Sequence, residues 1–249
     1  MRDFVISVSV LVALLAASLG SRVLYNRIPE RHRVEETEHV VRNLAGIFVV
    51  LASLVLSLMI NSARNTFDGV DKAVHAYATE IILLDRVMRQ YGTETAPARQ
   101  RLLAYLQQAA ARMGQSDPIL GSRRAEGMLS AVGNDLRDLK PADAEHVALK
   151  QRLERRFETI YEMRWGLVEQ SEGTIPMPLI VMLATWLALI FAAFGYRAPR
   201  NVVVAVTFVM SSVVIAAAIY LILDMDVPFD GTIQVSPEPL MRAIAELEK

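Results

Sequence analysis

Two long apolar runs lie back to back near the carboxyl end of the sequence, within Met177–Gly231. The first is MPLIVMLATWLALIFAAFGY and the second is VVVAVTFVMSSVVIAAAIYLIL, and the basic hinge RAPRN joins them. Each run has roughly 20 residues, the length that an α-helix needs to cross a hydrocarbon core of about 30 Å. The pair therefore predicts two transmembrane helices in an integral membrane protein.

Two further spans are expected near the amino end. Residues 4–24 read FVISVSVLVALLAASLGSRVL, and residues 44–60 form a second, shorter apolar run. The small residues of AASLGS also fit a signal-peptide cleavage site, but the run continues past them to Leu24, which favours a retained helix. A polar connector, Tyr25–Asn43, separates the two runs, and Pro29 prevents one continuous helix through it.

The polar residues of the second span follow one helical face. Ser53, Ser57, Asn61 and Arg64 are spaced by three or four residues along this run, which places them on one side of a helix. Such a stripe faces protein or water rather than lipid. Two hypotheses fit it. It lines a pore, with Arg64 favouring anions at the mouth, or it packs helices together, as small polar residues commonly do.

A heptad pattern continues beyond the second span without a helix breaker. Residues 45–91 are therefore expected to form one helix of about 70 Å. The pattern predicts the core of a helical bundle or, alternatively, a subunit contact. Its apolar residues are Phe67, Val70, Val74, Tyr77, Ile81, Leu84, Met88 and Tyr91.

Helices with Pro/Gly-containing breaks fill the region up to the third span. Pro97 is expected to open one helix, residues 123–139 a second, and Pro141 a third that runs to about Ser171. In the tail, Pro239 is expected to begin a short amphipathic helix with Leu240, Ile244 and Leu247 on one side.

The predicted fold class is an all-α membrane protein with four transmembrane helices and a helical bundle inserted between spans 2 and 3. The expected organisation is residues 1–60 for spans 1 and 2, 61–175 for the extramembrane helical domain, 176–223 for spans 3 and 4, and 224–249 for an acidic tail.

Composition excludes several chemistries. The chain has no cysteine, so disulfides and cysteine-ligated metals are excluded. The net charge of −1 gives no basis for nucleic-acid binding. His32, Glu36 and His39 lie close in the sequence but lack a further ligand, and His75 and His146 are expected at the surface. No metal, no cofactor and no catalytic residue is therefore predicted, and the chain is not expected to be an enzyme.

The segment after the fourth span combines acids with a turn sequence. Asp224, Asp226 and Asp230 could coordinate a hard cation, but the favoured interpretation is that they are solvated charges that end the span. Pro228, Phe229 and Gly231 form a turn that is expected to hold the tail against the bundle.

The carboxyl half resembles a known family. LALIFAAFGYRAPRN at 187–201, DVPFDG at 226–231 and IQVSPEPL at 233–240 are similar to the bacterial bestrophin-like membrane proteins of unknown function. The first half matches this family in layout alone, with two spans followed by a helical insert.

The resemblance implies a pentameric anion channel whose second helix lines the pore. It also implies a calcium site at the Pro-Phe-Gly turn and an acidic cluster after the fourth span. The sequence keeps Pro228, Phe229 and Gly231 but lacks a continuous run of acids. It has Ser53 and Ser57 where bestrophins place aromatic residues.

Two functions are therefore carried forward. The leading hypothesis is an oligomeric pore for small ions, lined by the second helix, in a multi-pass protein of the bacterial inner membrane. The alternative is a membrane-anchored scaffold or sensor whose helical domain binds a protein partner. The expected partners are the lipid bilayer and further copies of the chain. The arginines of the connector and the hinge favour a cytoplasmic position for both, whereas the resemblance favours the opposite orientation.

Overall fold

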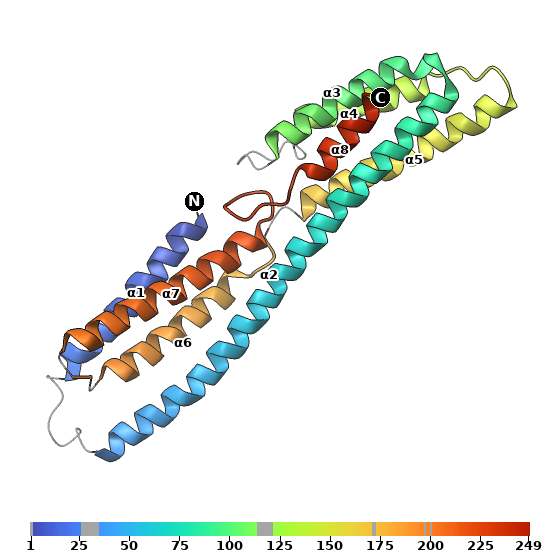
Figure 1. Ribbon diagram of the computed structural model, residues 1–249. Helices are drawn as coiled ribbons and strands as arrows, with labels where there is room; N and C mark the ends of the chain where they lie inside the picture. Colours follow the sequence, from blue (N-terminus) through green and yellow to red (C-terminus); the bar gives the residue numbers. More distant parts are fainter. Residues whose placement is uncertain (1, 26–34, 114–121, 171–172, 197, 200) are drawn as a thin grey trace. The chain divides into compact units, whose positions relative to one another are not determined.

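The computed structural model describes residues 2–25, 35–113, 122–170, 173–196, 198–199 and 201–249. Helices are the regular elements of this part of the chain (Figure 1). The chain divides into two compact units. Unit 1 comprises Met1–Asn65 and Thr174–Asp226, and unit 2 comprises Thr66–Gly173 and Val227–Lys249.

Unit 1 contains α1 (Arg2–Tyr25), the first part of α2 (Glu35–Tyr91), α6 (Met177–Gly195) and α7 (Val202–Asp226). These four helices are long and apolar enough to cross a membrane. Helix α1 packs along both α6 and α7, and the three lie side by side in Figure 1. The chain is thus an all-helical membrane protein with four apolar candidate spans.

The core of unit 1 joins all four helices. Leu14 of α1, Met59 of α2 and Leu183 of α6 are at most 1 % exposed, and Ile219 of α7 packs with them. Most other apolar side chains of these helices point outward, as is normal for spans whose solvent is lipid.

Helix α2 begins earlier than the sequence pattern indicated. A helix was expected from residue 45, but the structure extends it back to Glu35 through part of the predicted connector. The segment EETEH consists mostly of good helix formers, and acids are favoured in a first turn. Continuity of α2 through to Tyr91 is confirmed.

Unit 2 is built from the rest of α2, the short 3-10 helix η2 (Thr93–Thr95), α3 (Ala96–Arg112), α4 (Arg123–Arg137), α5 (Ala144–Glu169) and α8 (Glu238–Leu247). The heptad residues from Val70 to Tyr91 are buried in its core, and Phe67 packs against it. The interpretation of this pattern as bundle core is confirmed. Leu240, Ile244 and Leu247 of α8 join the same core, as predicted.

Helix α5 begins at Ala144, three residues after the expected start at Pro141. Asp143 is the N-cap. Its Oδ1 accepts the backbone N–H of His146 at 2.8 Å and lies 2.7 Å from His146 Nδ1. The His146 ring also stacks edge-on against Tyr91, with the centroids 5.1 Å apart. His146 is partly exposed, in keeping with the expected surface position, but it is not isolated, because Asp143 and Tyr91 contact it.

This contact couples the charges of the two side chains. The hydrogen bond to Asp143 raises the pKa of His146, and the hydrogen bonds from the His146 backbone and ring lower the pKa of Asp143. Because the folded pKa of His146 is raised, its contribution to stability is full below about pH 6.5, the ordinary histidine value. The contribution is lost as the pH rises through the folded pKa.

We expect Asp143→Asn to lower the pKa of His146 towards its ordinary value. Asparagine keeps a side-chain oxygen for the cap but removes the charge. The midpoint can be measured by NMR titration of isotope-labelled histidine in the full-length protein, with His146→Gln to assign the resonance. An unchanged midpoint in Asp143→Asn would contradict the coupling.

Candidate functional site: the exposed face of α2

The stripe predicted on the second span lies on the outside of unit 1. Ser53, Ser57, Asn61 and Arg64 are all exposed on α2. The opposite side of the helix carries Ala52, Met59 and Ala63, which are at most 4 % exposed and belong to the core of unit 1. At 100° per residue, the centre of the stripe lies roughly 135° around the helix from this buried side.

A third face of α2 is apolar and also exposed. Its members are Leu44, Ile47, Leu51 and Leu58, each at least 38 % exposed. This face lies roughly 115° beyond the polar stripe. Helix α2 thus presents one side to its own unit, one polar side outward and one apolar side outward.

The two serines satisfy their hydroxyl protons within the helix. Ser53 Oγ donates to the carbonyl oxygen of Val50 and Ser57 Oγ donates to that of Ser53, both at 2.8 Å. The hydroxyl oxygens keep their lone pairs on the exposed side, where they can take part in the hydration shell of an ion. Among the described core residues of unit 1, none comes from this stripe.

The acids of the tail motif differ from one another. Asp224 and Asp226 are 2 % and 3 % exposed, whereas Asp230 is exposed. The expectation that these acids are solvated charges is wrong for the first two. Asp226 accepts the Thr174 hydroxyl at 2.8 Å and the backbone N–H of Ile175 at 2.9 Å. Its carboxylate therefore ties the end of α7 to the segment that leads into α6.

The turn after Asp226 is closed by backbone hydrogen bonds. The N–H of Asp230 donates to the Val227 carbonyl at 3.1 Å, and that of Val235 donates to the Pro228 carbonyl at 3.0 Å. Gly231 has φ of 107°, a conformation that favours glycine. Phe229 is 7 % exposed and packs into the core of unit 2.

No group of three or more His, Cys, Asp or Glu side chains with a metal-binding arrangement occurs in the described part of the chain. His32 of the weak amino-terminal cluster lies outside the described residues. The described side chains therefore do not form a ligand set for the calcium site that the resemblance implies.

Unit 2 also buries a cation that the sequence pattern did not indicate. Arg164 is fully buried, and its Nε and Nη1 have no hydrogen-bond partner. The hydroxyls of Tyr77 and Tyr105 lie 2.8 Å apart nearby in the same core, and burial raises the pKa of both. The Arg164 guanidinium opposes this rise in each case. The spacing of α5 offered a signal, because Arg164 lies four residues after Ile160 and three before Leu167, on the apolar line of the helix.

Comparison with known proteins decides the family. Residues 12–240 match the family described as Bestrophin-like domain. The chain belongs to the bestrophin-like family. This match covers most of the chain, so the resemblance based on the carboxyl half is confirmed and extends through both apolar pairs.

Solved structures support the fold assignment. Crystal structures of two variants of a bacterial bestrophin homologue from Klebsiella pneumoniae, one with a tyrosine-to-alanine and one with an isoleucine-to-threonine change, give TM-scores of 0.67 and 0.65. Both are 14 % identical to this chain and cover 97 % of it, and the chain covers 97 % and 95 % of theirs. At this identity, the likeness shows that the chain has the bestrophin fold. A comparison with curated proteins finds no match.

Proposed function

We propose that this bestrophin-like protein is a homo-oligomeric pore for small ions in the bacterial inner membrane, with α2 lining the path. The observation that carries the proposal is the exposed stripe of Ser53, Ser57, Asn61 and Arg64. Asparagine and arginine are costly against lipid. They are accommodated when further copies surround a water-filled path with the same face of α2.

The other faces of α2 agree with this arrangement. One side is held in the core of unit 1 by Ala52, Met59 and Ala63, which fixes the rotation of the helix. The exposed apolar side can lie against lipid or a neighbouring copy. In this proposal the helical bundle of unit 2 is the insert between spans 2 and 3, and all four spans cross the membrane.

The heptad residues of α2 do not supply the contact between copies. A subunit contact was the alternative interpretation of this pattern, but the residues from Val70 to Tyr91 are buried in the core of unit 2. They therefore stabilise the unit itself.

We expect Ser57→Leu to abolish most of the ion flux. A leucine on this face narrows the path and removes a group that water wets, and hydrophobic constrictions stop conduction by dewetting. The measurement is chloride and potassium flux, with and without calcium, in liposomes that carry the purified protein. The ion whose flux the substitution abolishes is the permeant one.

Ser62→Leu is the matched control. Ser62 is exposed on the same helix but lies roughly 145° from the centre of the stripe, so flux should be retained. Equal loss in both variants would show a general effect on the helix. Absence of flux for both ions, from wild-type protein shown to be folded, would refute the pore.

A further inference from the structure

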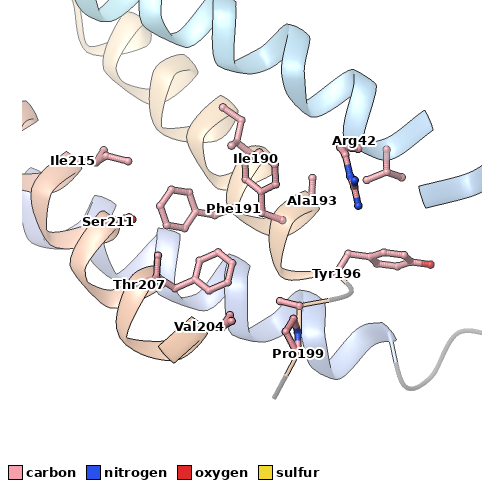
Figure 2. A pocket seen from close by; sticks show the side chains of 14 residues that line it. Arg42, Ile190, Phe191, Ala193, Tyr196, Pro199, Val204, Thr207, Ser211 and Ile215 are labelled. Carbon is pink, nitrogen blue, oxygen red and sulfur yellow. The ribbon is translucent and has the colours of Figure 1, made fainter. Parts of the chain in front are cut away.

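Unit 1 contains a cavity of about 640 Å³ between α6, α7 and the first turns of α2. Its wall is mainly apolar, and Figure 2 shows Phe191, Ile190 and Ile215 around it. The α7 part of the wall extends from Val204 to Ile215, roughly 16 Å along the helix. These dimensions and this lining suit a hydrocarbon chain better than a soluble metabolite.

Polar side chains gather at one end of the cavity. Arg42 and Tyr196 line it beside Pro199 of the hinge between α6 and α7, and Figure 2 shows both side chains at this end. Arginine and tyrosine are the side chains that commonly sit at the boundary between hydrocarbon and headgroups, where an apolar body meets water. The cavity therefore has an apolar wall within the span and a basic end at its boundary.

A second arginine lies next to the cavity. The guanidinium of Arg22 on α1 lies 5.3 Å from the ring centroid of Phe208, which lines the wall. Its Nε and Nη2 are buried and have no hydrogen-bond partner. A buried donor without a partner costs free energy, and more so when it is charged. Phe208 is one helical turn from Val204, at the hinge side of the α7 wall. An oxygen-rich anion at this side of the cavity would remove that cost.

We propose that the cavity binds an anionic phospholipid. One acyl chain lies along the apolar wall, and the phosphate lies at the end marked by Arg42 and Arg22. Two guanidiniums provide more positive charge than a single phosphate neutralises, which favours a lipid with net negative charge over a zwitterionic one. This site is separate from the pore proposed above, because α6, α7 and the beginning of α2 line it and none of the four stripe residues does.

The test compares lipids that differ in headgroup charge. Full-length protein in detergent is mixed with dioleoylphosphatidylglycerol or dioleoylphosphatidylcholine, and bound lipid is counted by native mass spectrometry while the Tm is followed. Wild-type protein should retain phosphatidylglycerol preferentially and gain Tm from it. Arg42→Gln should reduce that preference by about tenfold, and Arg22→Gln with Arg42→Gln should remove it.

Two control variants separate the effect of the arginine charge from the effect of the cavity volume. Arg2→Gln removes a positive charge from the other end of α1, where the side chain is 73 % exposed, and should leave the preference unchanged. Ala193→Leu fills the wall without altering charge and should reduce retention of both lipids. Arg42 is exposed, so its variant is expected to fold even if the Arg22 variant does not.

Three results would overturn the proposal. The first is equal retention of the two lipids by wild-type protein. The second is an unchanged preference in folded Arg42→Gln. The third is unchanged lipid retention in Ala193→Leu together with a smaller oligomer, which would place a neighbouring copy in the cavity.

Discussion

Asp85→Ala is expected to lower the free energy of unfolding of unit 2 by about 3–5 kcal/mol, the range for breaking a buried ion pair. The Asp85 side chain is 4 % exposed and lies between two arginines. Its Oδ2 accepts Arg89 Nε and its Oδ1 accepts Arg99 Nε, both at 2.6 Å. Removing the carboxylate leaves two partly buried guanidiniums without an anion.

The same arginines hold the end of α8, so the loss spreads beyond Asp85. Arg89 Nη2 donates to the carbonyls of Glu246 and Leu247, at 2.9 Å and 3.2 Å, and Arg99 Nη2 donates to that of Leu247 at 3.2 Å. These carbonyls are at the carboxyl end of the helix, where intrahelical donors are lacking. Asp85 orients both arginines toward them, and α8 should exchange its amide protons faster in the variant.

The two tryptophans allow unit 2 to be followed separately. Trp165 is in unit 2 and Trp186 is in unit 1, so chemical denaturation in a Trp186→Phe background reports unit 2 by fluorescence. Asp71→Ala is the control on the same helix. Asp71 is 40 % exposed and lies 3.9 Å from His75, and exposed pairs contribute about 0–1 kcal/mol. Equal midpoints for the Asp85 and Asp71 variants would show that the cluster does not stabilise the unit.

Helix periodicity predicted much of the fold because it depends on neighbours in the sequence. The heptad residues of α2 are core residues, Pro97 lies in the first turn of α3 and Pro239 in that of α8, as expected. Apolar spacing gives the signal in α2, and a proline in the first turn adds to it in α3 and α8. The start of α5 was missed because Asp143, rather than the nearby proline, supplies the cap.

Burial of charge could not be predicted from such local signals. Asp226 is buried because it accepts hydrogen bonds from Thr174 and Ile175, about fifty residues earlier in the chain. Asp85 is buried and pairs with Arg99, a partner that comes from α3 and that the spacing within α2 cannot indicate. An acidic residue that is solvated at the end of a span and one that is buried and joins two segments have the same sequence pattern.

The shared helical face of the four candidate residues was predicted, whereas the side of α2 that the unit covers was not. Helical spacing places Ser53, Ser57, Asn61 and Arg64 on one face, and the structure shows that this face is exposed. Spacing alone does not say which face the rest of the unit covers.

The role of the small residues in α1 could not be decided from the sequence. AASLGS suggested either a cleavage site or a helix, and its packing role became visible only beside α6.

Gly195→Ala is expected to destabilise unit 1 by at least about 1–3 kcal/mol, the usual cost of overpacking a close contact. A Cβ at Gly195 would lie 2.4 Å from Ser21 Oγ and 2.6 Å from the backbone oxygen of Ser18. A side chain can rotate away, but the backbone of α1 cannot move without separating the two helices. Membrane helices associate closely where such small residues meet, so the contact between α1 and α6 depends on this glycine.

Gly20→Ala gives the opposite expectation on the same helix pair. A Cβ at Gly20 meets no atom within 4 Å, and alanine gains up to about 1 kcal/mol over glycine in helix propensity. Both variants can be compared in a Trp165→Phe background, where Trp186 reports unit 1, by thermal and chemical denaturation in detergent. A lower stability for Gly195→Ala with an equal or higher stability for Gly20→Ala assigns the loss to contact with α1. Equal changes in the two variants would instead assign it to the glycine backbone, and would remove close packing of α1 as the reason why AASLGS is present.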